Sequence, residues 1–145
     1  GKILGRQDGD DKSAHNRIST QYNYLKKHNL DFCSTRAFIN DTSKKIPGYS
    51  YFVSPNILMK YKNPFIHGTL LLKKSILEEV GLYDENFYYA QDYKLMKDLI
   101  KKNYKFKIIN DCLYFLNMKN NISTLNKDEQ KYYSECVRKE IVPSV

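Results

Sequence analysis

Three carboxylates within four residues are the feature that most constrains this chain. The run Asp8-Gly9-Asp10-Asp11 comes directly behind a short apolar stretch, residues 2–7. Charges this dense are a poor way to build a core, so the stretch predicts a strand and the carboxylates predict a turn at its end. Mg²⁺ and Mn²⁺ prefer oxygen ligands, and Mg²⁺ is usually held by one or two carboxylates plus substrate phosphates. The turn therefore has two interpretations, an ordinary acidic turn and a metal site.

Hydrophobic periodicity divides the chain into alternating strands and helices. Apolar residues spaced by three and four predict amphipathic helices, whereas short runs rich in Phe, Thr and Ile predict strands. Capping-box patterns at Ser75 and Asn126 predict the starts of two helices, and Gly81 predicts the end of the first. This alternation indicates an α/β protein. The expected strands cover residues 2–7, 30–39, 68–73, 104–108 and 112–118, and the helices 14–28, 75–80, 91–102 and 126–141.

The composition is that of one globular domain. The chain has 145 residues, 41% of them hydrophobic, with 13 Tyr and 7 Phe. Its net charge of +8 suits nucleic acid, an anionic membrane face or a nucleotide sugar. Cys33, Cys112 and Cys136 are widely spaced, which indicates neither a zinc site nor a disulfide framework and favours a reduced, cytoplasmic setting. No apolar run is long enough to span a bilayer.

The order and spacing of several motifs resemble the centre of a family 2 glycosyltransferase with the GT-A fold. In that family a strand ends in Asp-x-Asp-Asp, and the next helix carries an Arg and a Gln. A His-containing strand, a Gly-x-Tyr-Asp-Glu-x-Phe turn and a Glu/Gln-Asp dipeptide follow. No single motif is specific, but their order over roughly residues 1–123 is. The matching residues are 1–11, Arg17, Gln21, 63–68, 81–87 and 91–95.

The resemblance implies inverting, metal-dependent transfer of a sugar from a nucleotide-sugar donor, expected to be a UDP-sugar, to a glycan or lipid-linked acceptor of surface polysaccharide synthesis. Asp92 would be the general base that deprotonates the acceptor hydroxyl, a role worth roughly 10²–10⁴ in rate. Asp8 and Asp10 would hold Mn²⁺ or Mg²⁺, which neutralises charge on the departing nucleoside diphosphate. The implied donor- and acceptor-binding residues are Asp11, His67, Gly68, Gln91 and Lys119.

Asp92 also has a plainer interpretation. It falls in the first turn of its expected helix, where the helix dipole and capping favour aspartate. The spacing places it on the face that carries Leu95, Met96 and Leu99, so its carboxylate is expected on the buried or cleft side. Arg17 suits a contact that braces the acidic turn more than it suits a contact with substrate.

One departure from the family pattern concerns the diphosphate. Many relatives carry an Arg and a His after the last strand, where this chain has Leu116 and Met118. Either Lys119 supplies the phosphate contact instead, or the diphosphate is bound with less help.

We expect a partial GT-A domain, with a mixed sheet and flanking helices. Family members begin with a βαβα half that binds the nucleoside, and this chain starts one strand before the Asp-x-Asp. We therefore expect inactivity in isolation, an open sheet edge that allows oligomerisation, and a place at the inner face of a membrane. The expected parts are strand, helix and strand (1–39), an irregular loop (40–62), the acceptor-side catalytic part (63–123) and a C-terminal helix (124–145).

Two other classes compete with the enzyme. A non-catalytic remnant that binds a partner would keep the same motifs, so the sequence hardly separates it from the enzyme. A nucleic-acid-binding module would use lysines interleaved with Tyr and Phe. Because the lysines are scattered and no known recognition motif occurs, we predict no nucleic-acid partner.

Overall fold

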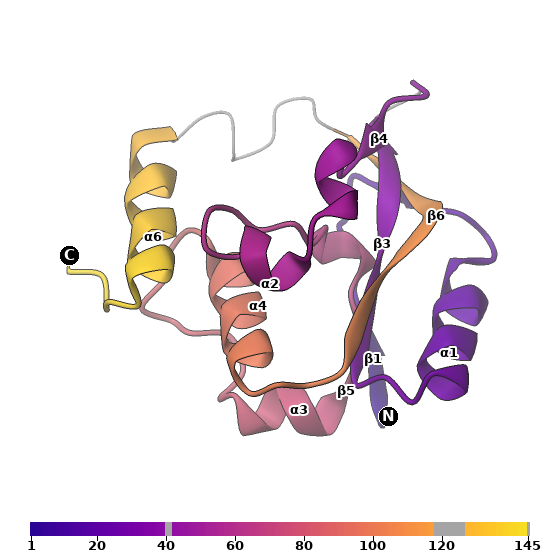
Figure 1. The fold of residues 1–145 in the computed structure, drawn as a ribbon, viewed down its shortest axis with the longest axis horizontal. Coiled ribbons are helices and arrows are strands. Elements are labelled where there is room, and N and C mark those ends of the chain that lie inside the picture. Colours follow the sequence, from indigo (N-terminus) through magenta and orange to yellow (C-terminus); the bar gives the residue numbers. More distant parts are fainter. Residues whose placement is uncertain (40–41, 118–126, 145) are drawn as a thin grey trace.

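The computed structural model describes residues 1–39, 42–117 and 127–144. In these ranges six strands form one mixed sheet, with helices on both of its faces (Figure 1). The strands are β1 (Ile3–Gly5), β2 (Lys12–Ser13), β3 (Phe32–Ile39), β4 (Lys45–Ile46), β5 (Leu71–Lys73) and β6 (Phe106–Leu116). The α-helices are α1 (Arg17–Lys27), α2 (Pro55–Leu58), α3 (Lys74–Glu79), α4 (Gln91–Lys101) and α6 (Lys127–Lys139), and the 3₁₀-helices are η1 (Tyr49–Phe52) and η2 (His67–Thr69).

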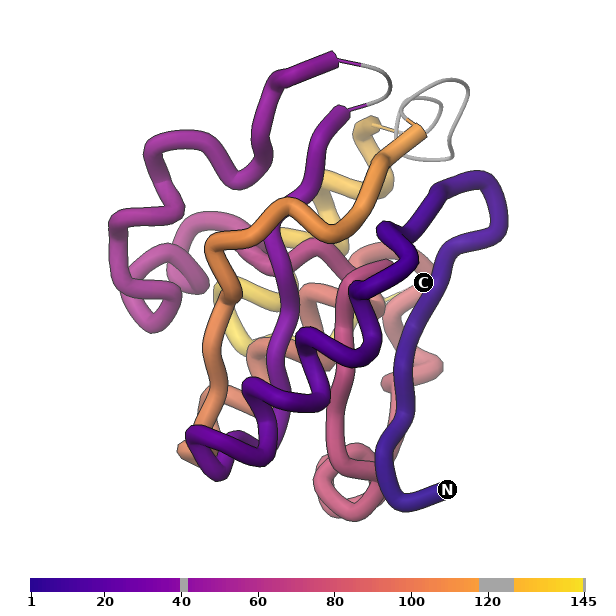
Figure 2. Tube along the Cα trace, turned by 90° about the vertical axis from the view of Figure 1, so that its right-hand side faces the viewer, coloured from indigo at the N-terminus to yellow at the C-terminus, as the bar shows by residue number. Residues whose placement is uncertain are grey.

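The sheet has the order β1-β5-β3-β6-β2, and β4 pairs with β3 beside this path. β3 and β6 run parallel, whereas the other pairs are antiparallel. β1 therefore lies at an edge, and the chain passes from it into the acidic turn (Figure 2). This mixed sheet with flanking helices is the α/β fold class that the sequence predicts.

β6 runs through a stretch that the sequence pattern divides into two strands. It pairs with β3 from Phe32 opposite Phe106 to Ile39 opposite Leu116. The register shifts after Thr35, which lies opposite Ile109, because the exposed pair Asn110-Asp111 forms a bulge. The polar bulge interrupts the hydrophobic alternation, although the strand itself continues.

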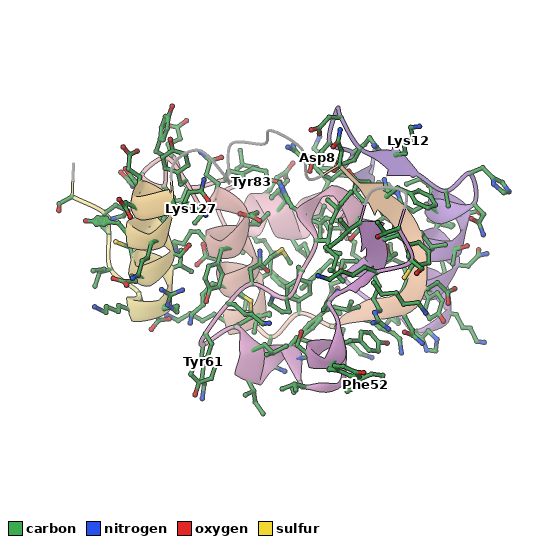
Figure 3. All side chains as sticks on the ribbon, turned by 90° about the horizontal axis from the view of Figure 1, so that it is seen from above. Asp8, Lys12, Phe52, Tyr61, Tyr83 and Lys127 are labelled. Atoms are coloured by element: carbon green, nitrogen blue, oxygen red, sulfur yellow. The ribbon has the colours of Figure 1, made fainter. Side chains whose placement is uncertain are left out.

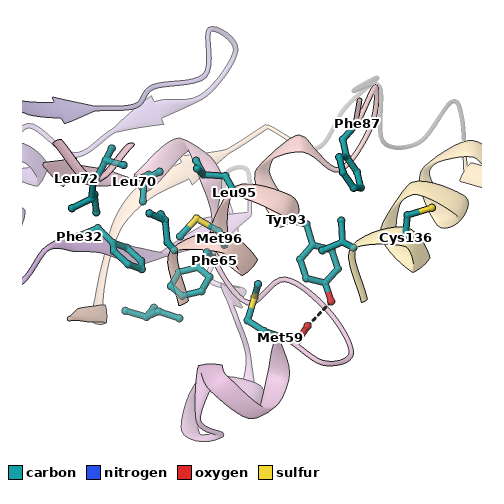
Figure 4. Close-up of a cluster of buried hydrophobic side chains, with 14 residues drawn as sticks. Phe32, Met59, Phe65, Leu70, Leu72, Phe87, Tyr93, Leu95, Met96 and Cys136 are labelled. Atoms are coloured by element: carbon teal, nitrogen blue, oxygen red, sulfur yellow. Dashed lines mark hydrogen bonds between the residues drawn. The ribbon is translucent and has the colours of Figure 1, made fainter. Parts of the chain in front are cut away.

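The core lies on both faces of the sheet because side chains alternate along each strand. In β3 Phe32 faces the larger cluster and Cys33 the smaller one, and Ile108 and Ile109 of β6 divide in the same way. α1 covers the smaller cluster on one face (Figure 2). On the other face α4 packs against the sheet, and α6 lies outside α4 (Figures 1 and 4). The larger cluster includes Phe65, Leu70, Leu72, Phe87, Leu95, Met96, Leu99, Cys136 and Val137.

Two local expectations are corrected. Ser75 does not cap a helix, because α3 already begins at Lys74 and its N-cap Lys73 makes no side-chain cap hydrogen bond. The stretch expected to be an irregular loop contains β4, η1 and α2. Gly81 does follow α3, with a φ of 85° that favours glycine. None of the helices in the described ranges has the length and apolar character needed to cross a bilayer.

Candidate active site

The acidic turn is fastened to β6 by Tyr114. The Asp11 amide donates to the Asp8 carbonyl at 3.2 Å, which closes the turn. The Tyr114 hydroxyl accepts from the Asp8 amide at 3.1 Å and donates to Asp11 Oδ2 at 2.8 Å. Asp11 Oδ1 accepts from the Asn117 amide at 2.7 Å, so both oxygens of this carboxylate are engaged by the protein. Asp11 therefore holds the turn in place, whereas the side chain of Asp8 is partly buried and that of Asp10 is exposed.

Gly68 makes room for the same tyrosine. A Cβ at this position would stand 2.6 Å from Cζ of Tyr114, closer than atoms can approach. Tyr114 itself has no exposed surface. Burial, together with donation to Asp11, raises the pKa of Tyr114, so the phenol keeps its proton and remains a donor. The predicted role of Gly68 at the substrate stays untested, but its steric role is clear.

Arg17 and Gln21 brace the chain just before the acidic turn, and the described hydrogen bonds of Arg17 are with a carbonyl and an amide rather than with a carboxylate. Arg17 Nη2 donates to the Arg6 carbonyl at 2.6 Å, and Nη1 donates to Gln21 Oε1 at 3.0 Å. Gln21 Nε2 then donates to the Thr69 carbonyl at 2.7 Å. Burial lowers the pKa of Arg17, whose guanidinium lies over the Tyr114 ring. Through these bonds α1 connects the end of β1 to η2.

His67 contacts Tyr83 and is influenced by the charges of Asp8 and Asp92. Its Nε2 is 2.7 Å from the Tyr83 hydroxyl, and the rings meet edge to face. Burial lowers the pKa of His67, while the charges of Asp92 and Asp8 act to raise it and that of Arg6 to lower it. Burial raises the pKa of Tyr83, on which the same three charges act. The charges of Asp8, from the acidic turn, and of Asp92, from α4, thus both act on His67.

Asp92 stands in the first turn of α4, as the sequence predicts. Ala90, in the N-cap position with φ 60°, makes no side-chain cap bond. Asp92 is partly buried, and its Oδ2 accepts from Asn63 Nδ2 at 3.2 Å. Leu95, Met96 and Leu99 on the same helix are buried, which confirms the predicted face. Asp92 also borders a cavity of about 410 Å³ between α4, α6 and the chain after α2, lined by Lys62, Asn63, Tyr89, Ala90, Tyr93, Gln130, Ser134 and Arg138.

The metal site predicted at Asp8 and Asp10 is geometrically open. Asp8 is partly buried and pairs with Arg6 Nε at 3.4 Å. Asp10 is exposed and makes no hydrogen bond or ion pair with the described part of the chain. Among the described residues no three His, Cys, Asp or Glu side chains converge as a complete metal cage. Two carboxylates alone do not complete the shell of Mg²⁺, so a cation here would need further ligands such as a substrate's phosphates.

The other predicted site residues differ in how the structure places them. Gln91 is exposed at the start of α4, next to Asp92. Lys119 lies outside the described residues. Sequence reasoning missed Tyr114 and Asn63 as contacts of the site, because they meet their carboxylates across 103 and 29 positions. A tyrosine on an apolar strand and an asparagine before a proline carry no signal that separates these roles from ordinary packing and turns.

The chain is similar in sequence to proteins named as glycosyltransferases. No family model matches the chain. It is 29% identical over 139 residues to the O-antigen biosynthesis glycosyltransferase WbnJ of Escherichia coli, which covers 92% of this chain and 53% of WbnJ. It is 26% identical over 141 residues to the uncharacterized glycosyltransferase MJ1057 of Methanocaldococcus jannaschii, covering 92% of this chain and 48% of that protein. The chain thus spans about half the length of the curated relatives it matches.

Solved structures agree in fold. The chain resembles S. aureus TarS residues 1–349 in complex with UDP, with a TM-score of 0.65 and 13% identity, over 95% of this chain and 40% of that one. The complex of TarS with UDP-GlcNAc matches with a TM-score of 0.64 and 12% identity, over 87% and 37%. The predicted glycosyltransferase fold is therefore confirmed, and the curated relatives are glycosyltransferases over the region that this chain matches.

Proposed function

We propose that this chain is the acceptor-side part of a glycosyltransferase that moves a sugar from a UDP-sugar to a glycan or lipid-linked acceptor, with inversion and with a divalent metal. The observation that supports this most is that Asp92 borders an open cavity and accepts a hydrogen bond from Asn63, while its charge and that of Asp8 both act on His67. A single displacement needs a leaving-group site and a base, which we assign to the acidic turn and to Asp92 beside its cavity. The relatives support transfer of sugars as the reaction class.

Asp92 supplies the base in this proposal. The acceptor hydroxyl gives its proton to the Asp92 carboxylate as its oxygen bonds to the anomeric carbon, and the bond from that carbon to the diphosphate oxygen breaks. Asn63 holds Oδ2 of the carboxylate, which leaves Oδ1 to receive the proton. Positioned proton transfer of this kind contributes roughly 10²–10⁴ in rate.

Asp8 and Asp10 are the residues that would hold Mn²⁺ or Mg²⁺. Such an ion, when bound, neutralises the negative charge that collects on the nucleoside diphosphate. Arg6 lies 3.4 Å from Asp8 and adds a fixed positive charge at the same place. In this proposal Arg6 contributes positive charge near the diphosphate, because Leu116 stands where many family members carry a basic residue.

The cavity beside Asp92 suits an acceptor sugar. Its lining combines amide and hydroxyl side chains with tyrosine rings, the mixture that binds sugar hydroxyls and their apolar faces. Lys62 and Arg138 add positive charge to the rim, which is compatible with a phosphate-bearing, lipid-linked acceptor. The matched region is about half of each curated relative, so we expect the nucleoside to need residues beyond these 145, and the chain alone to transfer little.

Metal-dependent binding of UDP tests the donor side of the proposal. Titration calorimetry with UDP, with and without Mn²⁺, is applied to a chimaera in which this chain replaces the matching region of E. coli WbnJ and carries the wild-type sequence, Asp10→Ala or the exposed control Asp128→Ala of α6. We expect Mn²⁺ to strengthen UDP binding to the wild type and to Asp128→Ala, but not to Asp10→Ala. Equal strengthening in all three proteins would remove Asp10 from the metal site.

A further inference from the structure

Five large apolar side chains are exposed within one short stretch of the chain. They belong to η1, to α2 and to the residues that follow each of them. Elsewhere the exposed apolar residues are more scattered, as on most protein surfaces. The five side chains, called the aromatic patch below, are Tyr49 (94% exposed), Phe52 (75%), Val53 (41%), Ile57 (54%) and Tyr61 (70%).

The patch is exposed although its backbone is firmly held. The buried Arg36 of β3 donates to the Pro47 carbonyl through Nε at 3.1 Å and Nη2 at 2.8 Å, and its guanidinium lies 4.7 Å from the centre of the Tyr51 ring. After α2, Met59 is buried in the core and its carbonyl accepts from Tyr93 Oη at 2.7 Å. The fold therefore holds the backbone at Pro47 and Met59, while the apolar side chains of Tyr49, Phe52, Val53 and Ile57 between them, and that of Tyr61 just beyond, are exposed.

Positive charge surrounds the patch without any nearby acid in the sequence. From residue 42 to residue 77 the chain has six lysines and no Asp or Glu. Lys60 and Lys62 flank Tyr61, and Lys44 and Lys45 precede the patch. Beneath Tyr51 and Phe52 a groove of about 540 Å³ is lined by further lysines, Lys105 and Lys107. Lys73 and Lys74 pair with Asp31 and Glu78, but Lys44, Lys45, Lys60 and Lys62 form no ion pair with the described residues. The stretch that carries the rings is therefore rich in cations and has no acid of its own.

We propose that the aromatic patch docks this protein on an anionic lipid surface. Tyrosine and phenylalanine insert at the level of the headgroups, and lysines around them attract acidic lipids. Protein interfaces also favour exposed aromatic rings, so it is the lysines beside the rings that favour an anionic lipid surface here. The proposal stands on this surface alone and does not depend on sugar transfer.

The location of the patch agrees with a protein that works between lipid and water. Figure 3 shows Phe52 and Tyr61 along one edge of the molecule, whereas Asp8 and Tyr83 lie along the opposite edge. Lys62, beside the patch, also lines the cavity that contains Asp92. A docked molecule would keep its acidic turn open to the water, while one side of the Asp92 cavity lies next to the lipid.

Vesicle sedimentation tests the proposal. Vesicles of phosphatidylcholine alone are compared with vesicles that also contain phosphatidylglycerol. The double variant Tyr49→Ser/Phe52→Ser removes two rings, and Lys60→Gln/Lys62→Gln removes two charges. Val142→Ser, at an exposed position outside the patch, and Lys27→Gln/Lys102→Gln are the matched controls. Thermal unfolding of each variant verifies that it is folded.

We expect the wild type to bind phosphatidylglycerol vesicles, less so at high salt, and to leave phosphatidylcholine vesicles largely unbound. Each patch variant should bind roughly tenfold more weakly, while both controls bind as the wild type does. Unchanged binding by folded patch variants would overturn the proposal. A wild type that binds neither the phosphatidylcholine vesicles nor those with phosphatidylglycerol would also overturn it. A wild type that forms oligomers, with patch variants that are monomers and no lipid binding, would identify a protein interface instead.

Discussion

At residue 68 the structure leaves space for a glycine only. We predict that Gly68→Ala lowers the free energy of unfolding by about 1 to 3 kcal/mol, because the new methyl group overlaps the buried Tyr114 ring. Urea unfolding measures the change. Gly9→Ala is the control, since no atom lies within 4 Å of a Cβ at that position. Equal stability of the two variants would contradict the close packing of Gly68 on Tyr114.

His67 gives the stability of the protein a dependence on pH. Burial holds the pKa of folded His67 below its ordinary value of 6.5, so the unfolded chain takes up a proton at a higher pH than the folded one. The contribution is fully present above pH 6.5 and is lost as the pH falls through 6.5 towards the folded pKa.

We therefore predict that the free energy of unfolding falls between about pH 7.5 and about pH 5, and that His67→Gln weakens this fall. Urea unfolding across the range measures it. The exposed His15, substituted by Gln, should leave the profile unchanged. A His67→Gln profile identical to that of the wild type would show that burial does not suppress protonation of His67.

The sequence predicts individual site residues where a local pattern marks them. Asp92 follows from helical spacing, and Asp8 and Asp10 follow from an acidic turn behind a strand. Tyr114 could not be predicted, because its contacts with Asp8 and Asp11 are made by residues more than a hundred positions away. Such a contact depends on β2 pairing with β6, which no local pattern specifies.

At the scale of elements, α1 is joined to η2 through one buried amide. Gln21 is fully buried and connects Arg17 to the Thr69 carbonyl. We predict that Gln21→Leu lowers the free energy of unfolding by about 2 to 4 kcal/mol, because it leaves a guanidinium and a carbonyl without this partner. Asn23→Leu, at an exposed position of α1, is the control. If urea unfolding gives equal losses for both variants, helix α1 is not held through this contact.

Helices and strands with a strong hydrophobic period can be predicted from the sequence, whereas strands defined by pairing with a distant segment cannot. α4 begins at Gln91 as predicted, since Leu95, Met96 and Leu99 repeat at helical spacing. β6 was divided wrongly at the bulge Asn110-Asp111, where the polar pair breaks the period while pairing with β3 continues. β2 went unrecognised because two residues, Lys12 and Ser13, have no period to detect.

At the scale of the whole molecule, the proposed metal-binding residues and the proposed base come from different elements, the turn after β1 and helix α4. The acidic turn follows an edge strand, and α4 carries Asp92, whose charge acts with that of Asp8 on His67. The topology class follows from alternating strands and helices, but the order of the strands does not. The distribution of lysine around the aromatic patch has no counterpart near the acidic turn, where carboxylates dominate.

Sugar transfer by a chimaera tests the central claim most directly. In this chimaera the chain replaces the matching region of E. coli WbnJ, and transfer from labelled UDP-sugars to lipid-linked acceptor is measured. We predict that Asp92→Asn lowers the transfer rate by about 10²–10⁴ while UDP binding stays within about twofold. Asp98→Asn, at the other end of α4 and paired with Lys94, should transfer at nearly the rate of the unmodified chimaera. Near-normal transfer by Asp92→Asn would contradict the account and leave Asp92 as a residue that only starts a helix.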